Sequence, residues 1–164
     1  MAKAVLLMAL CLLPALAMAI RTEKVKEDSL KLEGKVYCDT CRAGFETSAT
    51  TYIEGATVRV ECKSRSTNEL VYRQEAKTAS CGTYRMDIPK DQGNGICDVV
   101  LVSSPQANCA TVSPGRDRAR VILTRNNGIA TPIRYANAVG FLRSEPLAGC
   151  EAILKQYQET EDSY

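Results

Sequence analysis

Histidine is absent from this chain of 164 residues. Without it the chain has no Ser-His-Asp triad and no Cys-His pair, and it has no histidine for acid-base catalysis or zinc binding. The 19 acidic residues remain as catalytic candidates, but they are scattered over polar positions of the predicted strands. We therefore expect no enzyme activity, no metal site and no cofactor.

Tryptophan is also absent, and the two phenylalanines are Phe45 and Phe141. The core must therefore be built mainly from Val, Ile, Leu, Tyr and disulfides. An excess of one charge is lacking too, because 21 basic residues stand against 19 acidic ones. Phosphate binding needs a clustered basic face, so this balance argues against a nucleic-acid partner.

Long apolar runs are missing after the N-terminus. The one such run, residues 4–16, follows Lys3 and precedes Ala-Met-Ala at residues 17–19. This order is typical of a secretory signal peptide, whereas a membrane-spanning helix needs about 20 apolar residues. We expect a signal peptide at residues 1–19 and a single mature domain at residues 20–164, secreted to the extracellular space. An uncleaved membrane anchor is the alternative.

Short motifs for modification or metal binding are also missing. Residues 38–41 have the C-x-x-C spacing, but a redox motif of this kind opens a helix and a zinc site needs a second close pair. Residues 91–95 lack the ligand pattern of a calcium loop. No N-glycan is expected, because none of these asparagines has Ser or Thr two residues on: Asn68, Asn94, Asn108, Asn126, Asn127 and Asn137.

Cysteine, in contrast, is abundant. Cys11 would leave with the signal peptide, and seven cysteines would remain: Cys38, Cys41, Cys62, Cys81, Cys97, Cys109 and Cys150. In an oxidising compartment this density indicates structural disulfides. The odd number leaves one cysteine free or joined to another molecule. Spacing alone allows about 105 arrangements, which are seven choices of the odd cysteine times 15 connectivities.

The hydropathy pattern mostly has a period of two, as expected for half-buried strands. In residues 57–63, for example, Val58, Val60 and Cys62 share one face. The segment at residues 97–102 is continuously apolar and predicts a central strand. Strands are predicted at residues 36–38, 57–63, 70–77, 84–88, 97–102 and 118–123.

Turn signals separate these strands, and residues 91–95 (Asp-Gln-Gly-Asn-Gly) predict a hairpin between the strands on either side. Ile153, Leu154 and Tyr157 follow Cys150 at helical spacing and predict a short C-terminal helix. We therefore predict an all-β fold, an antiparallel barrel or sandwich of about seven strands held by disulfides.

One segment resembles a known family. Residues 33–42 read EGKVYCDTCR, which is similar to the signature of the Ole e I family of pollen proteins. The matching motif residues are Gly34, Val36, Tyr37, Cys38, Asp39, Cys41 and Arg42. Residues 116–121 and 133–137 resemble the grass-pollen group 11 branch of that family.

The resemblance implies a pairing that spacing does not give. It would join Cys38 to Cys109, Cys41 to Cys150 and Cys62 to Cys97. Cys81 then remains as the odd cysteine, either as a free or capped thiol or in an intermolecular disulfide. Relatives often carry a glycosylation sequon near residues 48–50, and this chain has none there.

The resemblance also implies a function. It points to a plant pollen protein and allergen that human IgE recognises. Its proposed role is in pollen hydration, germination or tube growth, as a monomer that binds an extracellular protein such as a receptor kinase ectodomain. From the sequence we expect the binding surface in loops at residues 42–54 and 126–134, since loops on a rigid scaffold commonly carry binding residues.

Two other functions compete with this one. A Kunitz-like serine protease inhibitor would need an exposed loop, with Arg116, Arg118 or Arg125 as the residue that enters the protease. A cell-wall or carbohydrate-binding protein would need exposed aromatic rings. The candidates for such a platform are Tyr52, Tyr135, Tyr157 and Tyr164, whereas Tyr37, Tyr72 and Tyr84 are expected in the core or at an edge.

Overall fold

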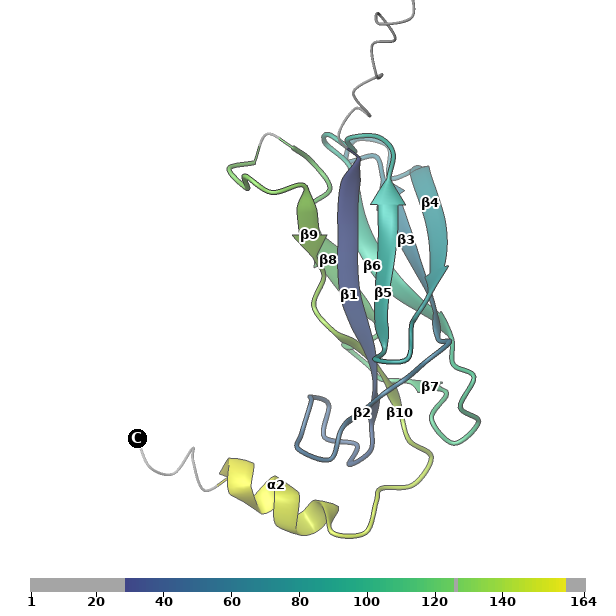
Figure 1. The fold of residues 1–164 in the computed structure, drawn as a ribbon, viewed down its shortest axis with the longest axis vertical. Coiled ribbons are helices and arrows are strands. Elements are labelled where there is room, and N and C mark those ends of the chain that lie inside the picture. The colour runs from purple at the N-terminus through teal and green to yellow at the C-terminus, as the bar shows by residue number, and fades with distance from the viewer. Residues whose placement is uncertain (1–28, 126, 159–164) are drawn as a thin grey trace, which may run out of the picture.

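A computed structural model describes residues 29–125 and 127–158, which form two β-sheets and one helix (Figure 1). The predicted signal peptide lies outside the described residues. The elements are β1 (Leu30–Asp39), β2 (Thr51–Tyr52), β3 (Thr57–Lys63), β4 (Leu70–Lys77), β5 (Thr83–Ile88), β6 (Ile96–Ser103), β7 (Thr111–Val112), β8 (Arg118–Val121), β9 (Ile133–Tyr135), β10 (Val139–Leu142) and α2 (Cys150–Gln158).

The first sheet is organised around β1, which is ten residues long and pairs with four other strands. Its first half pairs with β5 in antiparallel and with β9 in parallel orientation. Its second half pairs with β2 in antiparallel and with β10 in parallel orientation. The two parallel pairs differ from the expected antiparallel pattern. They arise because the chain forms the strands of the second sheet before it returns to pair with β1, and a long crossover of this kind lets two strands run in the same direction.

The second sheet is wholly antiparallel and has the order β4-β3-β6-β8. Strand β3 alternates buried and partly exposed residues along most of its length, as the period of two predicts. The apolar segment predicted as a central strand is β6, and it lies between β3 and β8. Strands β4 and β8 form the two edges of this sheet, and β8 lies on the same side of the molecule as β9 (Figure 1).

The inner faces of the two sheets bury one continuous hydrophobic core. Its largest fully buried side chains are Tyr37, Tyr84 and Phe141. The mostly-β fold is confirmed, and so is the short helix at the C-terminal end. Ten strands are found in the described residues where about seven were predicted, and three of them, β2, β7 and β9, are only two or three residues long.

The hairpin predicted at residues 91–95 is wrong. Strand β5 pairs with β1, whereas β6 pairs with β3 and β8, so this connection crosses from one sheet to the other. The glycines and Asp91 do reverse the chain, and Gly95 N–H donates to the Gln92 carbonyl. A turn sequence fixes the reversal but not the partner of the strand that follows, because each strand pairs where its apolar face is buried.

Candidate functional site

The motif residues at 34–42 lie mostly inside the fold. Val36 and Tyr37 are at most 1% exposed. The Tyr37 ring occupies the space that a side chain at Gly140 of β10 would need, since a Cβ placed there would lie 2.5 Å from Tyr37 Cζ. Gly34 faces Tyr84 in the β1–β5 pair in a similar way. These residues build the centre of the first sheet.

Asp39 and Arg42 shape the turn that follows β1. The Asp39 carboxylate is fully buried and accepts hydrogen bonds from the N–H groups of Ala43 (3.0 Å) and Gly44 (2.7 Å). Arg42 adopts a left-handed backbone conformation with φ of 57°. Its Nη1 donates to the Arg143 carbonyl at 2.7 Å. The motif therefore defines architecture, and a binding surface must be sought elsewhere.

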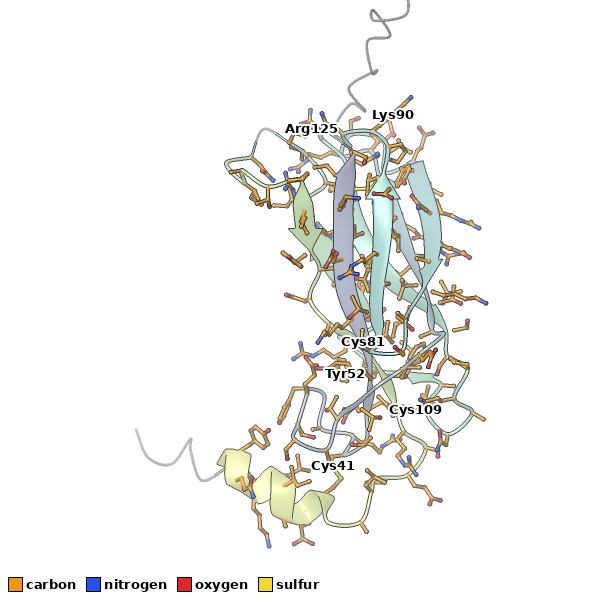
Figure 2. All side chains as sticks on the ribbon, in the orientation of Figure 1. Cys41, Tyr52, Cys81, Lys90, Cys109 and Arg125 are labelled. Atoms are coloured by element: carbon orange, nitrogen blue, oxygen red, sulfur yellow. A yellow bond between two sulfur atoms is a disulfide. The ribbon has the colours of Figure 1, made fainter. Side chains whose placement is uncertain are left out.

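Three disulfides cross-link the described residues: Cys38–Cys109, Cys41–Cys150 and Cys62–Cys97. The first ties the end of β1 to the loop before β7. The second ties the turn after β1 to the first residue of α2, over a sequence separation of 109 residues. The third joins facing positions of β3 and β6. Figure 2 labels Cys41 and Cys109, which lie at the end of the molecule that carries α2.

Cys81 is exposed and forms no disulfide in the structure (Figure 2). It lies in the turn between β4 and β5, and its sulfur is 3.3 Å from the Thr83 hydroxyl oxygen. Hydrogen bonds from the Thr83 side chain and backbone lower the pKa of the Cys81 thiol below its usual value. A larger fraction of this thiol is therefore ionised at neutral pH than in an ordinary exposed cysteine.

Of the two loops expected to bind a partner, residues 42–54 are held against the scaffold. Arg116 Nε donates to the Gly44 carbonyl at 2.6 Å. The Phe45 ring packs edge-on against Tyr157 of α2, with ring centroids 5.1 Å apart. The described part of the other loop, residues 127–134, lies at the opposite end of the molecule and leads into β9 (Figure 1).

A groove runs between β8 and this second loop with β9. Its volume is about 410 Å³, and its lining includes Arg120, Ile122, Ile129, Thr131, Arg134 and Tyr135. We call it the edge groove, because β8 is the last strand of the second sheet and β9 pairs only with β1 among the described residues. A smaller pocket of about 240 Å³ adjoins it and shares Ile129, Thr131 and Arg134.

Two hydrogen bonds link the segments on either side of β8 to the first sheet. Before β8, Gly140 N–H donates to the Arg116 carbonyl at 2.9 Å. After β8, Arg134 Nη2 donates to the Thr124 carbonyl at 2.7 Å. Between these contacts β8 and β9 are not paired with each other in the described residues. The groove therefore lies in the seam between the two sheets, where β8 and β9, as far as the structure describes the chain, are not hydrogen-bonded to each other.

Arg134 is the principal support of this seam. It is only 3% exposed, and its guanidinium also donates to the Thr131 and Ile133 carbonyls. The Nε–H of Arg134 has no hydrogen-bond partner among the described residues. Carbonyl oxygens solvate this buried positive charge beside the groove, and its field adds to the backbone hydrogen bonds that lower the pKa of the Asp91 carboxyl.

The walls of the edge groove carry exposed apolar side chains. Ile122 is 56% exposed, Ile129 46% and Tyr135 71%. Ile122 directly follows β8, Ile129 lies farther along the same connection, and Tyr135 is the last residue of β9. A broader hollow of about 710 Å³ lies near the β3–β4 turn, but it is lined mainly by small and polar turn residues. Aromatic and aliphatic groups that converge beside arginine are typical of the energetically important centre of a protein interface.

The candidate residues of the two competing functions are dispersed. Tyr52 and Tyr135 are exposed but lie on different parts of the first sheet, and Tyr52 donates a hydrogen bond to Glu46. Arg116 lies in a hydrogen-bonded turn, and Arg118 lies on β8. Arg125 is half-buried at the loop end labelled in Figure 2. Tyr164 lies outside the described residues.

The described residues contain no group of three or more Cys, Asp or Glu side chains placed to hold a metal ion. Across the same part of the chain, no helix combines the length and apolar character that crossing a membrane would require.

Comparison with known proteins decides the family. A family model described as "Pollen protein Ole e 1 like" matches residues 28–158. The chain belongs to this Ole e 1 family. Protein DOWNSTREAM OF FLC of Arabidopsis thaliana is 47% identical over 93% of this chain and 90% of its own length. Pollen allergen Phl p 11 of Phleum pratense is 48% identical over 76% of this chain and 87% of its own length. Neither name describes an enzyme.

The fold also matches a solved member of the pollen allergens. The crystal structure of the major plantain pollen allergen Pla l 1 superposes with a TM-score of 0.67 and 24% identity, over 74% of this chain and 99% of that one. At this identity the likeness supports the fold alone. The family match and the relatives make the chain a pollen-related Ole e 1 protein that resembles group 11 allergens.

The sequence did not reveal the edge groove itself. Residues 126–134 were predicted as a binding loop, and Tyr135 as a candidate aromatic. Ile122 appeared only as one position of an alternating strand, and Ile129 was not singled out. The available signal was Ile122, which shares the outward face of the predicted strand at residues 118–123 with Arg118 and Arg120. That signal says nothing of which other segment lies opposite.

Proposed function

We propose that this Ole e 1 family protein is a secreted, non-enzymatic binding module that recognises an extracellular protein through the edge groove. Its role would lie in pollen hydration, germination or tube growth, with a receptor kinase ectodomain as a candidate partner. Recognition by human IgE would be a consequence of its release from pollen. The proposal includes cleavage of the N-terminal signal peptide and a monomeric state.

The observation that carries this proposal is the convergence of Ile122, Ile129 and Tyr135 on one groove of a cross-linked scaffold. Burial of apolar area on binding contributes roughly 25 cal/mol per Å² before the costs of association. A groove on a scaffold cross-linked by three disulfides loses little conformational entropy when a partner binds. In contrast, the motif residues at 34–42 are mostly engaged in the fold.

The test is retention of extracellular pollen and pistil proteins by the immobilised full protein, with variants of the groove. Wild type should retain a partner that Tyr135→Ala combined with Ile129→Ala fails to retain. Arg73→Ala is a matched surface control on β4, the opposite edge of the second sheet, and should behave as wild type. Equal retention by all three proteins would refute the groove as the binding surface.

One observation favours a second candidate, carbohydrate binding. Tyr135 is 71% exposed, and it lines the groove beside Arg120, as an aromatic platform for a sugar would require. A glycan array with wild type and Tyr135→Ala separates the two candidates. Tyr135-dependent binding to a defined glycan, without a retained protein, would favour the carbohydrate.

The protease-inhibitor candidate has weaker support. Arg116 lies in a turn closed by a hydrogen bond from its own N–H to the Ser113 carbonyl. Arg118 belongs to a strand, and the backbone N–H of Arg125 donates to Asp91. Inhibitors of this type present an extended exposed loop, which none of these three positions provides. Trypsin titration with equimolar protein should therefore leave the protease fully active.

A further inference from the structure

Strand β8 presents one row of backbone groups to the side away from β6, and its residues Arg120 and Val121 line the edge groove. Its partner β6 faces it in antiparallel register, with Val99 opposite Ala119 and Val100 opposite Arg118. Leu101 N–H donates to the Asp117 carbonyl at 3.0 Å, in the same register. Since hydrogen-bonded and non-hydrogen-bonded pairs alternate, Ala119 bonds to β6 while Arg118 directs its N–H and carbonyl away from β6.

The same alternation applies two residues farther along, at Arg120. Neither Arg118 nor Arg120 has a backbone hydrogen-bond partner among the described residues on that outer side. Unpaired N–H and carbonyl groups in a row are a template for another strand. Partner segments commonly bind by adding a strand to such an edge, where the main chain supplies affinity and side-chain pockets supply specificity.

The charges of the groove select the kind of segment that fits. Arg120 and Arg134 line the edge groove, Arg125 lines the adjoining pocket, and no acidic residue lines either one. The Arg120 side chain is 62% exposed, although Asp98 accepts a hydrogen bond from its Nε at 2.6 Å. The Arg120 guanidinium can therefore contact a second carboxylate from outside without first losing Asp98, while the buried Arg134 contributes its positive charge to the groove.

We propose that the partner contributes an extended acidic segment, which adds to the outer edge of β8 and fills the edge groove. Alternate residues of the segment are apolar and rest on Ile122, Ile129 and Tyr135. Its carboxylates lie beside the arginines. This inference rests on the proposed function and specifies the chemistry of the partner.

Peptide display tests the proposal without knowledge of the partner. A library of random ten-residue peptides is selected on the folded full protein at low and physiological salt. The expected products alternate Asp or Glu with apolar residues and weaken as salt rises, because the contacts are partly exposed. Arg120→Glu should reduce their affinity at least tenfold. Arg73→Glu, on the opposite edge of the same sheet, should leave it unchanged.

Strand addition is tested separately at Arg118. Arg118→Pro and Arg118→Ala remove the same side chain, but only proline also removes the outward N–H, which β6 does not use. Loss of one backbone hydrogen bond should make binding to Arg118→Pro about fivefold weaker than to Arg118→Ala. Circular dichroism and the thermal midpoint of each variant establish that it is folded.

The outcomes separate this inference from the proposed function. Selected peptides that need Tyr135 but lack acidic residues, or that bind Arg118→Pro as well as Arg118→Ala, would overturn the acidic strand and leave the groove as the binding surface. Peptides indifferent to every groove variant would overturn both. A selection with no enriched peptide, or groove binding of oligogalacturonate instead, would overturn the acidic segment.

Discussion

The side chain of Tyr84 occupies the place that a side chain at Gly34 would need. The two residues face each other in the β1–β5 pair, and a Cβ built at Gly34 would lie 2.2 Å from the Tyr84 hydroxyl oxygen. Tyr84 is fully buried, so its ring has little room to move aside. Gly34 of the motif and Tyr84 of the core thus pack closely against each other, which agrees with a structural role for the motif.

Gly34→Ala should therefore destabilise the protein by about 2–3 kcal/mol, the range typical of overpacked cores. The free energy of unfolding from urea denaturation measures it. The contact itself is isolated by the double mutant with Tyr84→Leu, in which the extra cost of Gly34→Ala should fall below about 1 kcal/mol. An equal cost in both backgrounds would show that the ring is not responsible.

The Tyr84 hydroxyl has no hydrogen-bond partner among the described residues, and burial raises the pKa of this phenol well above its usual value. Removing an unsatisfied buried hydroxyl while keeping the ring recovers its desolvation cost. Tyr84→Phe should therefore stabilise the protein by about 1 kcal/mol in the same urea assay. A loss of stability would indicate a hydrogen bond that the structure does not contain.

The disulfides should each contribute several kcal/mol. On the chain-entropy model, the Cys41–Cys150 link, with its separation of 109 residues, contributes about 5 kcal/mol. The Cys62–Cys97 link, with 35, contributes about 4 kcal/mol. Replacing either pair by alanine should lower the unfolding free energy by similar amounts, since the dependence on loop length is logarithmic. A loss below about 1 kcal/mol for both pairs would contradict a cross-linked scaffold.

Cys81 should be the one cysteine of the described residues that reacts in the native protein. Because Thr83 lowers the pKa of its thiol, alkylation by iodoacetamide should reach half its maximal rate below the pH of an ordinary cysteine. Thr83→Val should move that midpoint to higher pH, because the hydrogen bond with the hydroxyl is lost while the one with the backbone remains. Mass spectrometry of the alkylated protein identifies the site, and labelling at any of the six paired cysteines would refute the expectation.

Asp91 should link pH to the stability of the loop end beside the groove. Its carboxylate accepts hydrogen bonds from the N–H groups of Gly93 and Arg125, which lower its pKa below the ordinary 3.8. A lowered folded-state pKa stabilises the protein above that ordinary value, and the contribution disappears as pH falls through the folded-state value.

Asp91→Asn should therefore lower the thermal midpoint at pH 7 by about 2 °C, a small effect because the site is exposed. The difference between variant and wild type should vanish in strong acid. Thermal melts across this pH range measure both. A difference that persists unchanged at the lowest pH would show that the carboxylate charge is not the cause.

The local pattern predicted several strands because it reports which face of a strand is buried. The alternation of Val58, Val60 and Cys62 located β3, and the continuous apolar segment located β6 as a central strand. The same pattern could not show that β5 pairs with β1 instead of β6, since both choices bury Tyr84 and Met86. Register and partner depend on where the apolar faces of all the strands meet.

The sequence could not predict the edge groove for a related reason. Ile122 directly follows a strand of one sheet, Ile129 lies in a loop, and Tyr135 belongs to a strand of the other sheet. Only the packing of the two sheets brings them together. Arg134 shows the same limit. As one residue of a family-like stretch it has no assigned role, whereas in the fold it bridges the seam to the Thr124 carbonyl.

Site-specific photo-crosslinking tests the edge groove as the binding surface most directly. A benzophenone amino acid replaces Tyr135 in one protein and Arg73 in another, and each is irradiated in extracellular fluid from germinating pollen on pistil tissue. The account predicts a discrete covalent adduct with an extracellular protein from position 135 and none from position 73. Adducts from position 73 with none from position 135 would contradict it.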